Sequence, residues 1–156
     1  MRKVLVLIVS HLAVGILGFA LGIYVLPILV APSGPSSGEV DAIKSAATYA
    51  AEFRRDLKGS DLLHWGEGHV SVAPRVVAFS GRLAPGPDYK LYLAPEFVET
   101  KEDFVRLKAQ SVRVGDVRTF ENFVVAVPES VDVSRYRSVV VWCERFSMFI
   151  TAARYR

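Results

Sequence analysis

The residue with the clearest capacity for chemistry in this 156-residue chain is its single cysteine, Cys143. It lies in residues 139–146, Val-Val-Val-Trp-Cys-Glu-Arg-Phe, so that Trp142 and Glu144 are its direct neighbours. Thiols of exported proteins normally pair, and Cys143 has no partner within the chain. The sulfur is therefore buried and inert, bonded to a second chain, or kept as a reactive redox thiol. Both faces of this segment are apolar, so its pattern leaves the three alternatives open.

Cys143, Met148, His64 and His69 together supply the ligand types of a blue-copper site. Their spacings argue against one, because each pair of residues is five apart and points to opposite faces of a regular strand. No histidine stands between Cys143 and Met148. We therefore predict no tightly held metal, keep these four residues as the only candidate ligands, and find no cofactor evident in the sequence.

Other sites with recognisable motifs are not indicated. Ser80-Gly81 lacks the G-x-S-x-G elbow of hydrolases, and Gly66-x-Gly68 lacks the third glycine and helix of a dinucleotide site. The net charge of +3 is too small to predict nucleic-acid binding. Hydrolase and transferase functions are therefore not predicted, and a redox role is left open.

The N-terminal segment, residues 1–30, is almost unbroken apolar sequence. Pro27 is expected to end the regular helix, which leaves residues 4–26, or about 35 Å, to cross the lipid bilayer. Arg2 and Lys3 precede the segment, so the positive-inside rule places the N-terminus in the cytoplasm and the C-terminal domain outside, in the periplasm of a Gram-negative cell.

A cleaved signal peptide is the rival interpretation of this segment. Its apolar region would be shorter and would end in a small-x-small cleavage site, whereas here Leu29 occupies such a position before Ala31. We predict an uncleaved signal anchor. Gly18 and Gly22 form a G-x-x-x-G pair, which makes the segment a candidate for homodimerisation.

Three further regions follow the apolar segment. Residues 31–41 are rich in Pro, Ser and Gly and predict a linker. Residues 42–59 carry apolar side chains at three- and four-residue steps and predict an amphipathic helix that ends at Gly59. Residues 60–156 predict a β domain of period-two alternation.

The β domain contains a series of short strand-like segments separated by turn residues. They are residues 69–72, 76–83, 89–94, 112–117, 123–127, 138–143 and 146–153. A capping-box-like pattern that begins at Thr100 predicts one short helix among them. The fold class is therefore mostly β, an antiparallel sandwich or barrel-like domain preceded by one transmembrane helix and one amphipathic helix.

Three stretches of the β domain resemble a known family. They are residues 79–93, Phe-Ser-Gly-Arg-Leu-Ala-Pro-Gly-Pro-Asp-Tyr-Lys-Leu-Tyr-Leu; residues 120–128, Phe-Glu-Asn-Phe-Val-Val-Ala-Val-Pro; and residues 136–150, Tyr-Arg-Ser-Val-Val-Val-Trp-Cys-Glu-Arg-Phe-Ser-Met-Phe-Ile. In this order and spacing they resemble the DM-thirteen domain, also called the electron-transfer DM-thirteen domain, over residues 64–155. The most specific parts are Gly-Pro-Asp-Tyr and Trp-Cys-x-x-Phe.

The resemblance implies a β-rich extracytoplasmic domain with a redox role centred on the cysteine that matches Cys143. The chain carries no second thiol and no haem-attachment motif, which argues against independent electron transfer and makes a redox protein a candidate partner. Gly86, Pro87, Asp88 and Tyr89 form the motif turn, in which glycine gives access to unusual backbone angles and proline fixes φ.

Two functions of different classes follow from the sequence. The first is a membrane-anchored extracytoplasmic domain that takes part in redox chemistry or electron transfer through Cys143. The second is a non-catalytic interaction module at the membrane surface, in which Cys143 only fills space in the core. The exposure of the sulfur discriminates between them.

Overall fold

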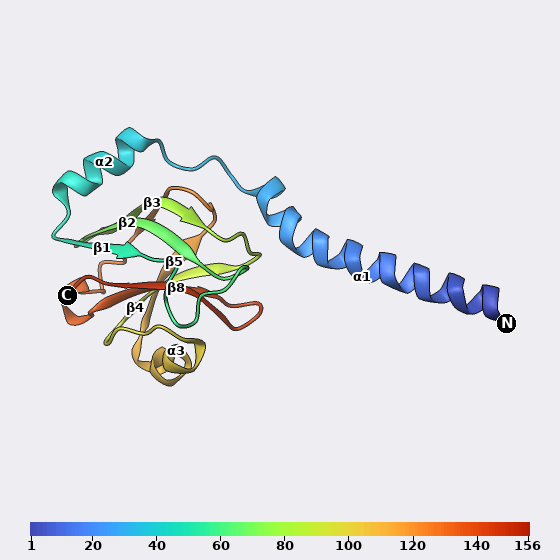
Figure 1. Cartoon of the computed structure of the whole chain (residues 1–156). Coiled ribbons are helices and arrows are strands. Elements are labelled where there is room, and N and C mark those ends of the chain that lie inside the picture. The colour runs from blue at the N-terminus through green and yellow to red at the C-terminus, as the bar shows by residue number, and fades with distance from the viewer.

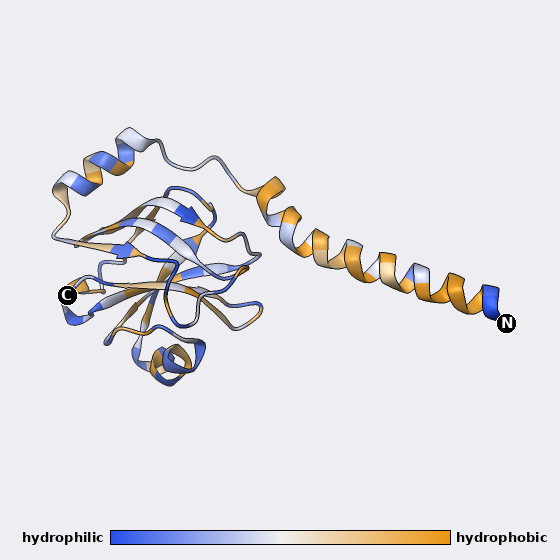
Figure 2. Cartoon of the chain, viewed as in Figure 1, coloured by the Kyte–Doolittle hydropathy of each residue, from blue (hydrophilic) through white to orange (hydrophobic).

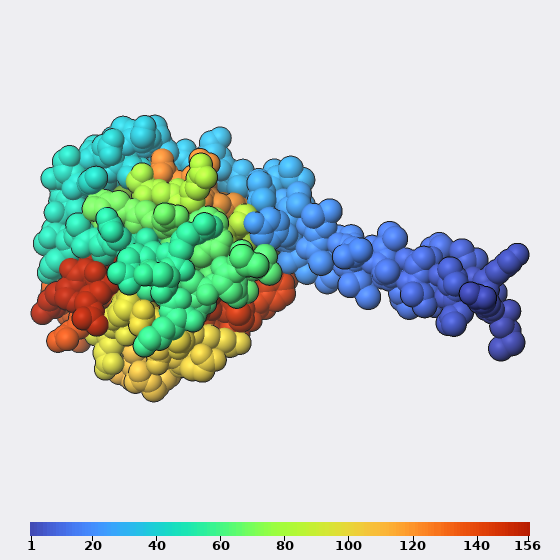
Figure 3. Space-filling view, viewed as in Figure 1, coloured from blue at the N-terminus to red at the C-terminus, as the bar shows by residue number.

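The computed structural model describes residues 1–156 and shows a long N-terminal helix joined to a β-rich domain (Figure 1). Helix α1, Arg2–Val30, leaves the domain as a rod, and its side chains are exposed up to Gly22 (Figure 3). Figure 2 shows that the helix is apolar along nearly its whole length. It is long and apolar enough to cross a membrane, and a signal sequence has the same properties.

Pro27 does not end α1, contrary to the prediction, because the helix continues to Val30. Proline in a helix interior removes one backbone hydrogen bond and crowds the preceding turn. Here its ring is the one buried side chain of the helix, and it lines a small cavity with Phe120 and the turn that holds Gly86. Packing against the β domain therefore offsets the cost of proline at this position.

The domain is a sandwich of two antiparallel four-stranded sheets, as the sequence predicted, and it does not close into a barrel. The first sheet has the order β1-β2-β3-β6 and the second the order β5-β4-β7-β8. The strand bounds are β1 Tyr49–Phe53, β2 Gly66–Ala73, β3 Val76–Leu83, β4 Tyr89–Ala94, β5 Val112–Val117, β6 Phe123–Ala126, β7 Ser138–Cys143 and β8 Met148–Arg154.

The core lies in two layers because side chains alternate across each strand. Between the sheets, Phe79 of β3 packs with Phe53 and Phe123 at ring-centroid distances of 5.2 and 5.0 Å. On the outer side of the second sheet, helix α3, Lys101–Leu107, covers a smaller cluster in which Phe104 and Trp142 are 4.9 Å apart. Two short 3-10 helices, η1 Lys108–Gln110 and η2 Val133–Arg135, complete the chain.

Helix α2, Ser37–Ala46, contacts β2 and β3 and lies on the opposite side of the sandwich from α3 (Figure 1). Its N-cap is Ser36, whose side chain accepts a hydrogen bond from the Glu39 amide at 3.2 Å. Thr100 caps α3 in the same way by accepting from the Asp103 amide at 3.2 Å, which confirms the predicted capping pattern.

The predicted helical range of residues 42–59 is wrong, because α2 begins within the predicted linker and ends at Ala46. The next residues form β1, which pairs antiparallel with β2 and buries Ala51 and Phe53 in the core between the sheets. Residues 49, 51 and 53 fit a strand period as well as a helical one, and pairing with β2 decides between them. Gly59 is not a helix stop, since its amide donates to the Glu99 carbonyl at 2.8 Å.

Candidate functional site

Cys143 is the last residue of β7 and faces the core between the two sheets, together with Val139 and Val141. It pairs with Tyr89 of β4 on one side and with Met148 of β8 on the other. The residue is 2% exposed and its thiol is free. Burial raises the pKa of the thiol, and the backbone amides of Phe146 and Asp88 only partly offset this effect. The sulfur is therefore a protonated thiol in an apolar setting at neutral pH.

A cavity of about 380 Å³ at the end of the sandwich has Cys143 among its lining residues. Its walls are mostly apolar and come from three sources, which are the end of the sandwich, the loop before β2 and helix α1. The lining residues are Ala20, Ile23, Tyr24, Leu63, His64, Pro85, Gly86, Pro87, Tyr89, Cys143, Phe146, Met148 and Ile150. This size and composition are typical of sites for small apolar ligands.

The motif turn of residues 86–89 forms one wall of this cavity and joins β4 to the end of β7. The Tyr89 hydroxyl donates to the Ala84 carbonyl at 2.8 Å, and the ring lies so close to Gly86 that a Cβ there would collide with it. The Asp88 carbonyl accepts from the Glu144 amide at 3.0 Å. Glycine is needed at position 86 to make room for the ring, and the turn thereby fixes the strand that pairs with Cys143.

The carboxylate of Asp88 forms an ion pair with Lys90 at 2.6 Å. Lys90 also contacts Asp116 at 3.1 Å, and Asp116 contacts Arg113 at 2.7 Å. The hydrogen bonds from Arg113 and then Lys90 lower the pKa of Asp116 to about 2. This charged network lies beside the motif turn, and the ion pair with Lys90 holds Asp88 in place.

His64 is held in a fixed orientation at the cavity by Asp61. One Asp61 oxygen accepts from the amides of Leu63 and His64 at 2.7 and 2.8 Å, and the carboxylate binds His64 Nδ1 at 2.8 Å. Burial alone would raise the pKa of Asp61, but the hydrogen bonds from His64 and Leu63 outweigh it and lower the pKa. Sequence reasoning named His64 and missed Asp61, although the Asp-x-x-His spacing is a local signal for such a pair.

The four candidate metal ligands do not come together. His64, Cys143 and Met148 line the same cavity, whereas His69 lies in the first sheet opposite Glu52 and Ser80. The structure contains no group of three or more His, Cys, Asp or Glu side chains placed to hold a metal ion. The residues around Cys143 therefore form an apolar site with one imidazole, and they do not form a blue-copper ligand set.

Trp142 and Glu144 lie on the other side of the second sheet from the thiol. Trp142 is 1% exposed under α3. Glu144 accepts hydrogen bonds from the Tyr92 hydroxyl and from Lys108 Nζ, the latter at 2.7 Å. Burial alone would raise the pKa of Glu144, but the hydrogen bonds from Lys108 and Tyr92 lower it. The sequence neighbours of Cys143 thus belong to a polar network on the outer face.

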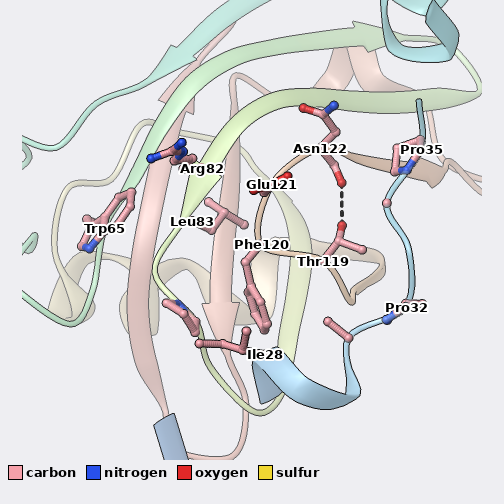
Figure 4. A pocket seen from close by; sticks show the side chains of 13 residues that line it. Ile28, Pro32, Pro35, Trp65, Arg82, Leu83, Thr119, Phe120, Glu121 and Asn122 are labelled. Atoms are coloured by element: carbon pink, nitrogen blue, oxygen red, sulfur yellow. Dashed lines mark hydrogen bonds between the residues drawn. The ribbon is translucent and has the colours of Figure 1, made fainter. Parts of the chain in front are cut away.

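A second cavity, of about 530 Å³, lies where the linker after α1 passes the domain (Figure 4). Pro32 and Pro35 of the linker stand on one side of it and Trp65 and Arg82 on the other, and the Phe120 ring lies beside Ile28 between them (Figure 4). The Thr119 hydroxyl donates to the Asn122 carbonyl at 2.6 Å and stabilises the loop that forms its base (Figure 4). The cavity has mixed polarity, and none of its lining residues carries a thiol or an imidazole.

Comparison with known proteins gives one match. No curated protein and no solved structure matches the chain. The sequence model of the electron transfer DM13 family matches residues 53–155. This range includes all of β2 through β8 and only the last residue of β1. The match contains the motif turn, His64 and Cys143, which belong to the walls of the apolar cavity other than the wall formed by α1. This chain belongs to the electron transfer DM13 family.

Proposed function

We propose that this protein is a membrane-anchored extracytoplasmic domain with a redox or electron-transfer role centred on Cys143. The family supports the redox role, and the observation that carries the choice of residue is the position of the thiol at the apolar cavity beside α1. Arg2 and Lys3 before the apolar helix support an anchor with a cytoplasmic N-terminus. Gly18 and Gly22 are on the exposed part of α1, where dimerisation through them stays a prediction.

The environment of the thiol restricts the chemistry that it supports. A raised pKa makes Cys143 a poor nucleophile toward reagents in bulk water, since the thiolate is the reactive form. A reactant inside the cavity would meet the thiol without crossing the core. The proposed role is therefore exchange with a bound partner or cofactor.

The test uses the full-length chain in its native membranes. Cys143 should be found partly in a reversibly oxidised form by mass spectrometry, and a small alkylating reagent should reach it before unfolding. Cys143→Ala is the control that shows whether any redox signal depends on this residue. A thiol that stays fully reduced and unreactive until the protein unfolds, with no cofactor copurifying, would contradict the proposal.

The alternative function is a non-catalytic interaction module, and the 2% exposure of Cys143 favours it. Under this alternative the sulfur is a small apolar group within the core cluster that includes Val141 and Ile150, and the loops carry the function. Complementation of a deletion strain by Cys143→Ala discriminates between the two. Full complementation supports the interaction module, whereas loss of function at normal protein levels supports redox chemistry.

A further inference from the structure

Helix α1 is longer than a membrane span requires, and the surplus lies against the domain. Its 29 residues extend for about 43 Å, whereas a bilayer core of about 30 Å needs roughly 20 residues. The side chains are exposed up to Gly22, then Ile23 and Val25 become half-buried and Pro27 is buried. The last turns therefore dock on the sandwich, and a helix that spans the bilayer holds the Cys143 cavity at the membrane surface.

The mouth of this cavity is apolar where it meets the helix. Outside the first thirty residues, four large apolar side chains are exposed: Leu62 at 94%, Leu63 at 56%, Val105 at 54% and Phe146 at 48%. Leu63 and Phe146 line the cavity, and Leu62 directly precedes Leu63 in the sequence. The β7–β8 turn that carries Phe146 lies at the end of the sandwich from which α1 departs (Figures 1 and 3). A molecule dissolved in the bilayer thus has an apolar route to the thiol.

The polar groups inside the cavity restrict its ligand. The Tyr89 hydroxyl is already bonded to Ala84, which leaves the Tyr24 hydroxyl on α1, the Cys143 thiol and the imidazole of His64. Asp61 occupies His64 Nδ1, and Nε2 has no hydrogen-bond partner. A charged or highly polar ligand would leave its own groups unpaired in these walls. An apolar ring with one oxygen for Nε2 fits, while an acyl chain would leave the imidazole unused.

We propose that the cavity between α1 and the sandwich binds a membrane-dissolved quinone or quinol, with its ring near Cys143 and an oxygen hydrogen-bonded to Nε2 of His64. Quinol oxygens donate to a neutral imidazole and quinone oxygens accept from a protonated one, so the Asp61–His64 pair suits both forms. This inference deepens the proposed function, on which it rests, by naming the chemical class of the redox partner. It concerns binding and includes no bond-forming step.

The test follows thermal unfolding of the full-length chain in phosphatidylcholine nanodiscs with duroquinone as the probe. Every ring carbon of duroquinone is substituted, which prevents thiol addition. At a hundredfold excess over its dissociation constant, duroquinone should raise the melting temperature by about 5–10 °C. Oleate at the same concentration should raise it less.

Three variants locate the binding site. Ala20→Trp fills the cavity from the helix side without touching the sandwich core and should abolish the shift. Ala13→Trp is the matched control on the free part of α1 and should keep it. His64→Leu removes the hydrogen bond and should weaken binding about tenfold.

The outcomes separate this inference from the proposed function. Quinone binding would be overturned if duroquinone did not shift the melting temperature, or if it shifted that of Ala20→Trp as much as that of the wild type. It would also be overturned if oleate raised the melting temperature as much as duroquinone in both the wild type and His64→Leu. Cys143→Ala should retain most of the shift, because the thiol supplies only part of one wall. Duroquinone binding to a protein whose Cys143 never changes oxidation state would leave the binding inference standing and contradict the redox function.

Discussion

The two faces of β7 differ in every property that bears on chemistry. Cys143 faces an apolar core and a cavity that opens toward α1, and its pKa is raised by burial. Trp142 faces α3, and beyond the strand end Glu144 joins Tyr92 and Lys108 in a hydrogen-bonded network that lowers its pKa. Residues adjacent in sequence thus belong to different environments, which is what the period-two geometry of a strand imposes.

This difference shows which groups can influence the thiol. Glu144 is committed to Lys108 and Tyr92, so its charge does not serve Cys143. The groups that share the cavity come from distant segments, namely His64, the motif turn and α1. Changes on the outer face should therefore alter stability and leave thiol chemistry intact, whereas changes on the inner face should alter the thiol chemistry as well as stability.

Trp142→Ala should have the largest effect on stability. The ring is 1% exposed and packs against Phe104 at 4.9 Å, so its removal should cost about 3–5 kcal/mol. Urea unfolding of the full-length chain in detergent measures this, with the exposed Val105→Ala on α3 as control. Alkylation of Cys143 under conditions where the variant is still folded should match the wild-type rate. A changed rate in the folded variant would show that the two faces are coupled.

On the inner face, Cys143→Ser and Cys143→Ala separate two contributions of the Cys143 side chain to stability, its apolar character and its volume. Serine replaces the weakly polar thiol with a hydroxyl in a buried apolar setting and should cost about 1–3 kcal/mol. Alanine removes one buried atom without adding a polar group and should cost about 1 kcal/mol. The same urea unfolding experiment ranks the two. A serine variant as stable as the alanine variant would show that the Cys143 environment is wet enough to solvate a hydroxyl.

The sandwich could be predicted because strand-like alternation is a local property. Residues 76–83, 89–94, 112–117 and 138–143 were predicted with the bounds that the structure gives. β1 was missed because its five residues extend a helical pattern, and only its hydrogen bonds to β2 make it a strand. No local signal encodes that pairing, since the partner residues, such as Val70 opposite Ala51, lie beyond an intervening loop.

The candidate site was predictable only in part. Cys143, His64, Met148 and the motif turn could be identified as chemically capable or family-specific residues, and the structure places them around one cavity. The cavity itself forms because the last turns of α1 pack against the end of the sandwich. This contact brings together residues more than a hundred positions apart in the sequence. Periodicity contains no information on such contacts, so the sequence could not show that the thiol has an apolar entrance.

The smallest expected effect is that of Glu144→Gln on the outer face. The side chains of Glu144 and Lys108 are 27% and 33% exposed, so loss of their ion pair at 2.7 Å should cost only about 0.5–1 kcal/mol at neutral pH. Because the folded state lowers the pKa of Glu144 below its ordinary 4.5, this stability is present above pH 4.5 and is lost as the pH falls through the folded-state pKa.

The difference in unfolding free energy between the wild type and Glu144→Gln should therefore be constant from pH 7 to about 5 and shrink below that range. Glu102→Gln, at an exposed position on α3, is the matched control and should show a smaller difference at neutral pH. A difference that persists unchanged at acid pH would mean that Glu144 acts through packing or its hydrogen bond to Tyr92. The outer face of β7 would then be stabilised by packing and neutral hydrogen bonds without a net contribution from charge. The two faces of β7 would in that case differ in how their side chains pack and would not differ in electrostatics.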